Sequence, residues 1–271
     1  MTVAAIGVDA GSTTLKVAAL DAAGTLLWSR LEPASPRTAE QATALLAACA
    51  SEAGPGKGAP IVATGYGRDL VLGAVRRVTE ITCHARGVFA QVGGACTVLD
   101  LGGQDTKVLA LGASGRVLDF AMNDRCAAGT GRFLEVTAAR LGLSLEAFDA
   151  AATAAHHEAV ISSTCTVFAE SEMVSLLARG TPVEAIAAGL HRAMARRVAA
   201  LARQVGIRPP ILASGGVALS GSVRRALSRE LDQDVGLPRH AQLLGAVGAA
   251  LVGLDPSSPG PIRVAGRPRP V

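Results

Sequence analysis

Residues 9–16 read Asp-Ala-Gly-Ser-Thr-Thr-Leu-Lys, and residues 100–107 read Asp-Leu-Gly-Gly-Gln-Asp-Thr-Lys. In both stretches an Asp comes first, a Gly stands two residues later and a Lys seven residues later, at a constant offset of 91 residues. Each stretch joins two apolar runs, and a turn ending in glycine and a third strand-like run follow. This pattern predicts strand, turn, strand, turn, strand in each copy, and therefore an internal duplication.

The first turn of each copy has the composition of a phosphate-binding loop. Small residues at a hairpin tip leave backbone N–H groups open to a phosphate, hydroxyls add donors, and the lysine adds a positive charge. An aspartate at the end of the preceding strand suits Mg²⁺, and Asp9 and Asp100 are the candidates. Two such tips favour two related domains that bind one polyphosphate. The candidate phosphate-binding residues are Gly11, Ser12, Thr13, Thr14, Lys16, Gly102, Gly103, Gln104, Asp105 and Lys107.

Two further glycine turns stand after apolar runs. Residues 211–218 (Ile-Leu-Ala-Ser-Gly-Gly-Val-Ala) read as a buried strand that ends at Gly215 and Gly216 before a helix. A nucleoside could lie against this bare backbone, and a purely structural turn is an equal interpretation. Residues 63–68 (Ala-Thr-Gly-Tyr-Gly-Arg) form another turn, for which a structural and a functional role stay equally open.

Apolar residues at helical spacing predict helices over residues 39–50, 182–205 and 242–254. Together with the two sets of strands they indicate the α/β class, in which hairpins and parallel strands are backed by helices.

Composition limits the function classes. A length of 271 residues favours about two domains. No charge-free apolar run of about 18 residues is present, so no membrane span is expected. The first residues lack a secretory signal pattern, so we expect a cytoplasmic protein. The net charge of +4 comes without a dense basic run, and nucleic acid is therefore not an expected partner.

The five cysteines fall into two groups. Without an export signal disulfides are not expected, and no Cys-x-x-Cys pair is present. Cys49, Cys83 and Cys96 read as small buried hydrophobic residues. Cys126 and Cys165 each precede an expected helix, where amides and the helix dipole favour a thiolate or an anionic metal cluster.

Two thiolates per chain do not complete a tetrahedral sulfur site, but two chains on a twofold axis would supply four for one [4Fe–4S] cluster. A pair of buried thiols, a redox-sensing dithiol and a zinc site shared between chains are the alternatives.

The paired loops resemble those of the superfamily of acetate kinase, sugar kinases, Hsp70 and actin. Five strings narrow the resemblance to the BadF/BadG/BcrA/BcrD ATPase family, and within it to activators (archerases) of 2-hydroxyacyl-CoA dehydratases. The resemblance runs from about residue 5 to about residue 252, and the cysteine-bearing strings are its most specific part. The strings are Gly-Val-Asp-Ala-Gly-Ser-Thr-Thr-Leu-Lys, Ala-Thr-Gly-Tyr-Gly-Arg, Asp-Leu-Gly-Gly-Gln-Asp-Thr-Lys, Asn-Asp-Arg-Cys-Ala-Ala-Gly-Thr-Gly-Arg-Phe and Ser-Ser-Thr-Cys-Thr-Val-Phe-Ala-Glu-Ser-Glu.

The resemblance implies a nucleotide site. The loops at 9–16 and 100–107 would bind the phosphates of ATP or ADP together with Mg²⁺ at their aspartates. Gln104 is our candidate for orienting the attacking water, by analogy with other NTPases. The resemblance implies that Gly215 and Gly216 lie at the adenosine. It also implies that Gly129 and Gly131 lie near the nucleotide.

The resemblance also implies a two-domain fold and a shared cluster. The first ATPase domain would comprise residues 1–94 plus 242–254, the second residues 95–241, and residues 255–271 would form a tail. Cys126 and Cys165 would ligate one [4Fe–4S] cluster per homodimer.

The implied activity is ATP-driven transfer of single electrons. A reduced ferredoxin or flavodoxin would be the donor, and a dehydratase with iron–sulfur clusters would be the acceptor. One alternative keeps the chemistry but makes the chain a subunit of an ATP-dependent benzoyl-CoA reductase, paired with a homologous subunit. A small-molecule kinase of the same superfamily and a non-enzymatic nucleotide-dependent scaffold or regulator are the others, and both leave Cys126 and Cys165 without a role.

Overall fold

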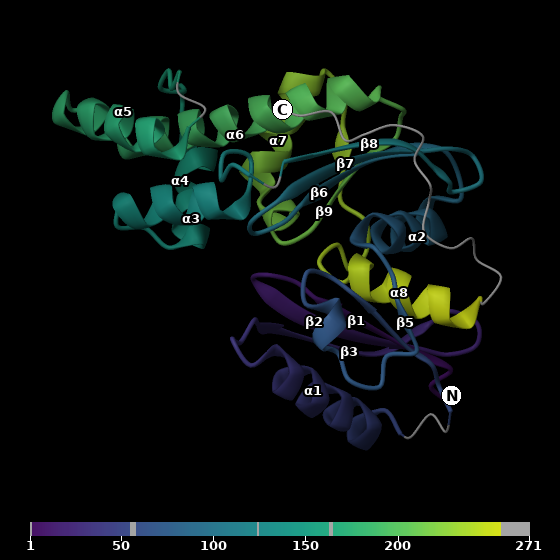
Figure 1. The fold of residues 1–271 in the computed structure, drawn as a ribbon. Coiled ribbons are helices and arrows are strands. Elements are labelled where there is room, and N and C mark those ends of the chain that lie inside the picture. The colour runs from purple at the N-terminus through teal and green to yellow at the C-terminus, as the bar shows by residue number, and fades with distance from the viewer. Residues whose placement is uncertain (1, 55–57, 124, 163–164, 256–271) are drawn as a thin grey trace. The chain divides into compact units, whose positions relative to one another are not determined.

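The computed structural model describes residues 2–54, 58–123, 125–162 and 165–255 (Figure 1). These form two compact units, of which the first contains residues 2–54, 58–95, 111–118 and 242–255. The second contains residues 96–110, 119–123, 125–162 and 165–241. Apart from Asp255, the predicted tail at 255–271 lies outside the described residues. Among the helices that the structure places, each is too short or too polar to cross a lipid bilayer.

The structure confirms the internal duplication. β1 (Ala5–Ala10), β2 (Thr14–Leu20) and β3 (Leu26–Pro33) form the first copy. β6 (Cys96–Leu101), β7 (Thr106–Leu111) and β8 (Val117–Asn123) form the second, and both ends of β6 lie 91 residues after those of β1. The hairpin tips join β1 to β2 and β6 to β7, as the sequence predicts.

The two sheets share one topology. The first has the order β3-β2-β1-β4-β5 and the second the order β8-β7-β6-β9-β10. β4 (Ile61–Thr64) pairs with β1 in parallel, and β9 (Ile211–Ser214) pairs with β6 in the same way. The edge strands β5 (Arg76–Arg77) and β10 (Val235–Gly236) are short and also parallel to their neighbours. The predicted mixture of hairpins and parallel strands is confirmed.

Helices cover both faces of the first sheet. α1 (Thr38–Glu52) packs on β2 and β3, and α8 (Leu244–Leu254) packs on β1, β2 and β4 (Figure 1). α2 (Glu80–Val92) lies against α8. A short 3₁₀ turn, η1 (Arg68–Leu70), follows β4. Apolar side chains of β1 and β2 are fully buried between these layers, which fixes the position of the turn between the two strands.

The second unit carries a larger helical layer. α3 (Gly131–Arg140), α4 (Leu145–Ala154) and α7 (Gly221–Leu231) pack on the long helix α6 (Val183–Val205). α5 (Thr166–Ala178) contacts α3 and α6, and the 3₁₀ turn η2 (Val217–Leu219) follows β9. α6 buries the residues at its predicted apolar positions, including Ile186, Leu190, Met194 and Val198. The three predicted helices correspond to α1, α6 and α8.

Candidate functional site

The first phosphate-loop candidate is the tip between β1 and β2. Asp9 is the last residue but one of the buried strand β1 and is only 3% exposed. Lys16 lies on β2, with its Nζ 3.0 Å from Asp9 Oδ2. The Gly11 N–H donates to Thr14 O at 3.1 Å and closes the turn. Ser12 and Thr13 are exposed at the tip, with their hydroxyls available to a ligand. The arrangement presents a buried carboxylate, a lysine and small exposed residues at one point.

Asp9 has a polar surrounding that sequence reasoning missed. A Cβ atom added to Gly245, on α8, would lie 2.8 Å from Asp9 Oδ2 and 2.9 Å from His84 Nε2. The carboxylate and the imidazole therefore converge on this glycine, and both side chains are buried. The neighbouring Cys83 thiol is buried as well, which raises its pKa to about 12 and keeps it protonated. This agrees with its predicted role as a buried thiol.

The second candidate is the tip between β6 and β7. Asp100 is buried, and Lys107 Nζ lies 2.6 Å from Asp105 Oδ2 and 3.9 Å from Asp100 Oδ2. One buried ammonium thus lies beside two carboxylates and offsets part of the cost of burying them. The Gly102 N–H donates to Asp105 O at 3.0 Å, in the same pattern as the first turn. Gln104 is exposed at the tip, where a water-orienting side chain would need to be.

Each sheet adds a third element beside its turn. Thr64 pairs with Asp9 in the parallel register of β4 and β1, and Ser214 pairs with Asp100 in that of β9 and β6. Ser214 Oγ donates to Asp100 Oδ1 at 3.2 Å. The buried Thr64 hydroxyl lies near the Cys83 thiol but makes no well-formed hydrogen bond with described residues.

The glycine after each of these hydroxyl residues is required by the backbone. Gly65 has a φ of +93° and Gly215 a φ of +88°, where side chains are disfavoured. A Cβ atom on Gly65 would lie 2.4 Å from Ala10 O, and one on Gly215 would lie 2.3 Å from Leu101 O. The turn at 63–68, whose role the sequence left open, is therefore the counterpart of the turn at 211–218. The sequence signal for this correspondence was the string Ala-(Thr/Ser)-Gly, which both turns contain.

α3 begins directly on the second turn. The N–H groups of Gly131 and Arg132 donate to the carbonyls of Gly102 and Gly103 at 2.9 and 2.7 Å. A Cβ atom on Gly131 would lie 3.1 Å from both Gly103 Cα and Val217 Cγ2. The second unit thus gathers several candidate residues that are far apart in sequence around one turn: Asp100, Gly102, Gly103, Gly131 and Ser214, followed by Gly215 and the exposed Gly216.

The loop that carries Cys126 is fastened to the same strands. Asn123 Nδ2 donates to the carbonyls of Cys126 at 2.9 Å and Ala128 at 2.6 Å. Thr106 Oγ1, at the start of β7, donates to Gly129 O at 2.5 Å. The conformation of the loop is therefore tied to β7, which begins directly after the phosphate turn, and to the end of β8.

The two predicted ligand cysteines differ from the other three in exposure. Cys126 and Cys165 are partly exposed, whereas Cys49, Cys83 and Cys96 are buried. Cys165 is the N-cap of α5, as predicted. Cys126 does not stand at a helix terminus, since α3 begins only at Gly131 and its N-cap is Thr130. The expected position was wrong because Gly129, with a φ of +86°, inserts a turn between the cysteine and the helix.

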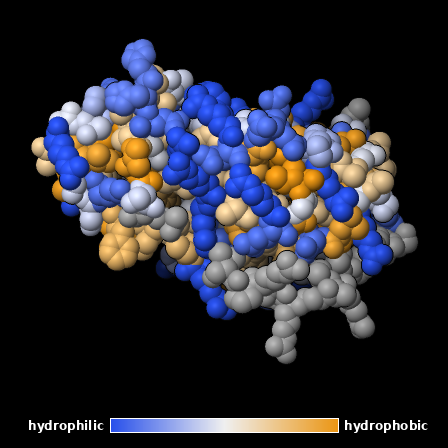
Figure 2. Space-filling view, turned by 90° about the horizontal axis from the view of Figure 1, so that it is seen from above, coloured by the Kyte–Doolittle hydropathy of each residue, from blue (hydrophilic) through white to orange (hydrophobic). Residues whose placement is uncertain are grey.

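Apolar side chains are exposed next to Cys165. Val160, Val167 and Phe168 are 80%, 67% and 66% exposed, and Val174 continues the surface along α5. The left end of Figure 2, where Figure 1 places α5, shows hydrophobic surface among hydrophilic side chains. Large apolar residues are rarely left this exposed in a cluster without a partner surface.

Comparisons with known proteins agree with this geometry. The 2-hydroxyisocaproyl-CoA dehydratase activator of Clostridioides difficile is 44% identical over 195 residues, which are 72% of this chain and 73% of that protein. The solved structure of the Clostridium difficile activator of this dehydratase, with bound ADPNP, superposes with a TM-score of 0.87 at 38% identity, covering 93% of this chain and 95% of that one. A benzoyl-CoA reductase subunit of Thauera aromatica is 32% identical over 199 residues, 71% of this chain and 70% of that protein.

These similarities confirm the predicted fold class, that of the actin, Hsp70 and sugar-kinase superfamily, and the predicted relationship. Residues 6–253, nearly the whole described chain, match the model of a single protein family. The chain belongs to the BadF/BadG/BcrA/BcrD ATPase family.

Proposed function

We propose that this chain hydrolyses ATP to deliver single electrons, taken from a reduced ferredoxin or flavodoxin, to an iron–sulfur partner of the 2-hydroxyacyl-CoA dehydratase type. The two phosphate turns would bind ATP and Mg²⁺, and water would attack the terminal phosphate to give ADP and phosphate. Cys126 and Cys165 would hold a [4Fe–4S] cluster shared by two copies of the chain. The cluster would supply a one-electron carrier.

The observation that carries the proposal is the connection between the second turn and the Cys126 loop. α3 begins with two hydrogen bonds to the carbonyls of Gly102 and Gly103, and Thr106 holds the loop at Gly129. A change in the turn on binding or losing a phosphate would therefore be transmitted to the cysteine through these hydrogen bonds, which lie only a few residues from Cys126. A plain kinase needs no such connection, because its substrate takes the phosphate directly.

The residues at the strand ends fit Mg²⁺ and a polyphosphate. Asp9 and Asp100 are buried carboxylates at equivalent positions of the duplicated strands, and each has a lysine within 4 Å. Mg²⁺ prefers one or two carboxylates together with phosphate oxygens and water. Lys16 and Lys107 would move their charge toward the phosphates when the cation takes its place beside the carboxylates.

The thiols fit a cluster shared between chains. Among the described residues no group of three or more His, Cys, Asp or Glu side chains could hold a metal ion. Two partly exposed cysteines per chain therefore need a second chain to reach the four thiolates of a [4Fe–4S] cluster. The exposed apolar residues around Cys165, Val167 and Phe168 foremost, would be covered in that dimer.

A second candidate is an ATPase subunit of a benzoyl-CoA reductase, favoured by the 32% identity to the subunit of the Thauera enzyme. The two candidates share the chemistry and differ in assembly. A stable homodimer that contains the cluster when expressed alone favours the dehydratase activator. A cluster that forms only when a homologous subunit is co-expressed favours the reductase.

The test is to purify the protein without oxygen and to measure iron, acid-labile sulfide and the absorption spectrum. About two iron and two sulfide per chain are expected, because four of each are divided between two chains. Cys126→Ala and Cys165→Ala should each lose them. Cys49→Ala is the matched control, because Cys49 is buried in α1 of the first unit.

A colourless, iron-free, air-stable protein that still hydrolyses ATP would exclude electron transfer and would leave the small-molecule kinase as the better interpretation. Iron that is retained in both Cys126→Ala and Cys165→Ala would refute the assignment of the ligands.

A further inference from the structure

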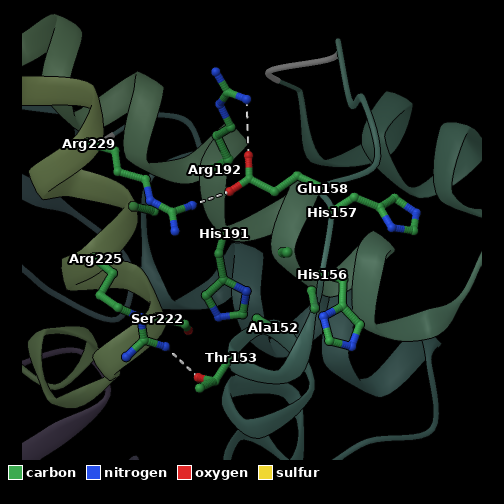
Figure 3. Close-up of a pocket in the computed structure, with 13 residues that line it drawn as sticks. Ala152, Thr153, His156, His157, Glu158, His191, Arg192, Ser222, Arg225 and Arg229 are labelled. Carbon is green, nitrogen blue, oxygen red and sulfur yellow. Dashed lines mark hydrogen bonds and ion pairs between the residues drawn. The ribbon is translucent and has the colours of Figure 1, made fainter.

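The second unit contains a cavity that neither the nucleotide nor the cluster proposal uses. It has a volume of about 380 Å³ and lies among the end of α4, the turn at 155–158, α6 and α7 (Figure 3). This size is at the lower end of the roughly 300–1,000 Å³ typical of small-molecule sites. The lining residues that carry the argument are Glu158, His191, Arg192, Ser222, Arg225 and Arg229.

The cavity wall is rich in positive charge. Arg192 reaches it from α6, and Arg225 and Arg229 come from α7, one turn apart. Glu158 is the only carboxylate among the lining residues. It bridges two of the guanidinium groups, at 3.0 Å from Arg192 and 2.8 Å from Arg229. Three positive charges thus face one negative charge within the wall.

The carboxylates outside the cavity wall do not neutralise the positive charge of Arg225. Its guanidinium donates to the neutral Thr153 hydroxyl at 2.5 Å, the one hydrogen bond that its side chain makes within the described residues. Asp149, on α4, is not part of the wall and already accepts hydrogen bonds from the Ser220 and Ser222 hydroxyls. Glu230, near the end of α7, is shared by Arg192 and Arg196 of α6.

The floor of the cavity is polar, rigid and uncharged. Burial lowers the pKa of His191, so its imidazole is neutral near pH 7. Its Nδ1–H donates to Ala187 O at 2.7 Å, and its ring packs on Phe148 at a centroid distance of 4.6 Å. Figure 3 shows the His191 ring between the Arg225 and His156 side chains.

Small side chains create the space. The helix and turn positions that face one another across the cavity are occupied by four alanines, Ala152, Ala155, Ala188 and Ala226. Arg192, Arg225 and Arg229 are exposed, so the space is a hollow that is open to solvent and that a small anion can enter. An anion placed there would meet guanidinium groups from two helices without displacing any apolar side chain.

We propose that this cavity binds a phosphate group, either free phosphate or a small phosphate monoester. Guanidinium groups from separate helices suit a tetrahedral anion whose several oxygens can each accept a charge-assisted hydrogen bond, whereas a carboxylate offers only two oxygens in one plane. Arg225 is the main anchor, because no carboxylate of the described residues forms an ion pair with it. Glu158 acts against the ligand by occupying Arg192 and Arg229.

The experiment is a calorimetric titration of inorganic phosphate into the full-length protein at constant ionic strength. An excess of the non-hydrolysable ATP analogue ADPNP, with Mg²⁺, is present so that every phosphate position of the proposed nucleotide site is filled. Arg225→Gln should weaken phosphate binding by roughly tenfold, the loss of one charge-assisted hydrogen bond. Glu158→Gln should strengthen binding, since it removes the competing charge. Arg116→Gln is the control, because Arg116 is exposed in the turn between β7 and β8 and not in the cavity wall.

Opposite effects of Arg225→Gln and Glu158→Gln, with Arg116→Gln like the wild type, would support the site. Tighter binding of glycerol 3-phosphate than of inorganic phosphate would then identify a monoester as the ligand, and the reverse would identify free phosphate. The absence of saturable binding, an equal loss in Arg116→Gln, or equal affinity for acetate and phosphate would overturn the proposal. None of these outcomes depends on whether the chain hydrolyses ATP.

Discussion

Ser214 Oγ donates a hydrogen bond of 3.2 Å to Asp100 Oδ1, across the parallel strands β9 and β6. Both side chains are buried, so this bond fixes the carboxylate at the end of its strand. In the other sheet Thr64 stands in the same register beside Asp9, but its hydroxyl makes no well-formed hydrogen bond within the described residues. The duplication has kept a hydroxyl beside each strand-end aspartate, and within the described residues only the Ser214 hydroxyl makes a well-formed hydrogen bond to its aspartate.

Ser214→Ala should lower the rate of Mg²⁺-dependent ATP hydrolysis. The change removes the donor that orients Asp100, and a hydrogen bond to a charged group contributes about 1.5–3 kcal/mol. We expect a loss of roughly tenfold or more in kcat/KM, because 1.4 kcal/mol corresponds to one power of ten. Steady-state kinetics at varied Mg²⁺ concentration would measure it, and an increased Mg²⁺ requirement would identify the carboxylate as the affected group.

Thr64→Val is the matched change in the first sheet. It replaces a buried hydroxyl without a well-formed bond by a methyl group of similar volume. The free energy of unfolding of the ligand-free protein should therefore stay the same or rise, whereas Ser214→Ala should lower it by about 1.5–3 kcal/mol. Urea denaturation of the two variants compares them directly. A larger loss of stability in Thr64→Val than in Ser214→Ala would contradict the difference between the two sheets.

Gly215→Ala should be strongly destabilising. Alanine at a φ of +88° carries the strain of the left-handed region, and its Cβ would lie 2.3 Å from Leu101 O. Gly93→Ala separates the two effects, because Gly93 has a φ of +65° and nothing within 4 Å of its added Cβ. We expect about 1–2 kcal/mol for Gly93→Ala, from strain alone, and a clearly larger loss for Gly215→Ala. Equal losses in chemical denaturation would mean that β6 moves aside at no cost.

Asn123→Asp tests how the Cys126 loop is held. The buried amide of Asn123 donates to two loop carbonyls, and a carboxylate would place oxygen against oxygen at both contacts. We expect lower iron content per chain after anaerobic purification, although both cysteines remain, and a loss of about 2–3 kcal/mol in stability. Asp119→Asn, on the same strand, should keep the wild-type iron content. Full iron retention in Asn123→Asp would show that the loop does not need this anchor.

The duplicated strands could be predicted because their information is local. Alternating apolar runs around a Gly turn specify a hairpin, and the constant offset of 91 residues extends the prediction from one copy to the other. The phosphate-loop residues of each tip are close in sequence, so their positions followed from the hairpins. The pairing of Thr64 with Asp9 and of Ser214 with Asp100 joins strands about 50 and 110 residues apart, and no periodicity encodes it.

The environment of Asp9 shows the same limit. His84 comes from α2 and Gly245 from α8, and they meet at the carboxylate only because both helices pack against one another beside β1. The Cys126 position failed for a different reason. Its helix was expected directly after it, but the positive φ of Gly129 delays α3 until Gly131. The sequence Gly-x-Gly does not predict whether a given glycine adopts a positive or a negative φ, because glycine populates both readily.

His191 should make the protein less stable as the pH falls below about 6.5. Burial lowers the pKa of this imidazole in the folded chain, against the opposing effects of the Ala187 carbonyl and Asp149, while the unfolded chain has the ordinary value of 6.5. Below pH 6.5 the unfolded state therefore binds more protons than the folded state, and the free energy of unfolding decreases with falling pH. The contribution is fully present above pH 6.5 and is lost as the pH falls toward the pKa that His191 has in the folded chain.

His191→Asn keeps a donor for Ala187 O and cannot titrate, so the stability of this variant should fall less than that of the wild type between pH 7.5 and 5.5. His156→Asn, at an exposed histidine, should follow the wild type, and parallel curves for all three proteins in urea denaturation would refute the assignment.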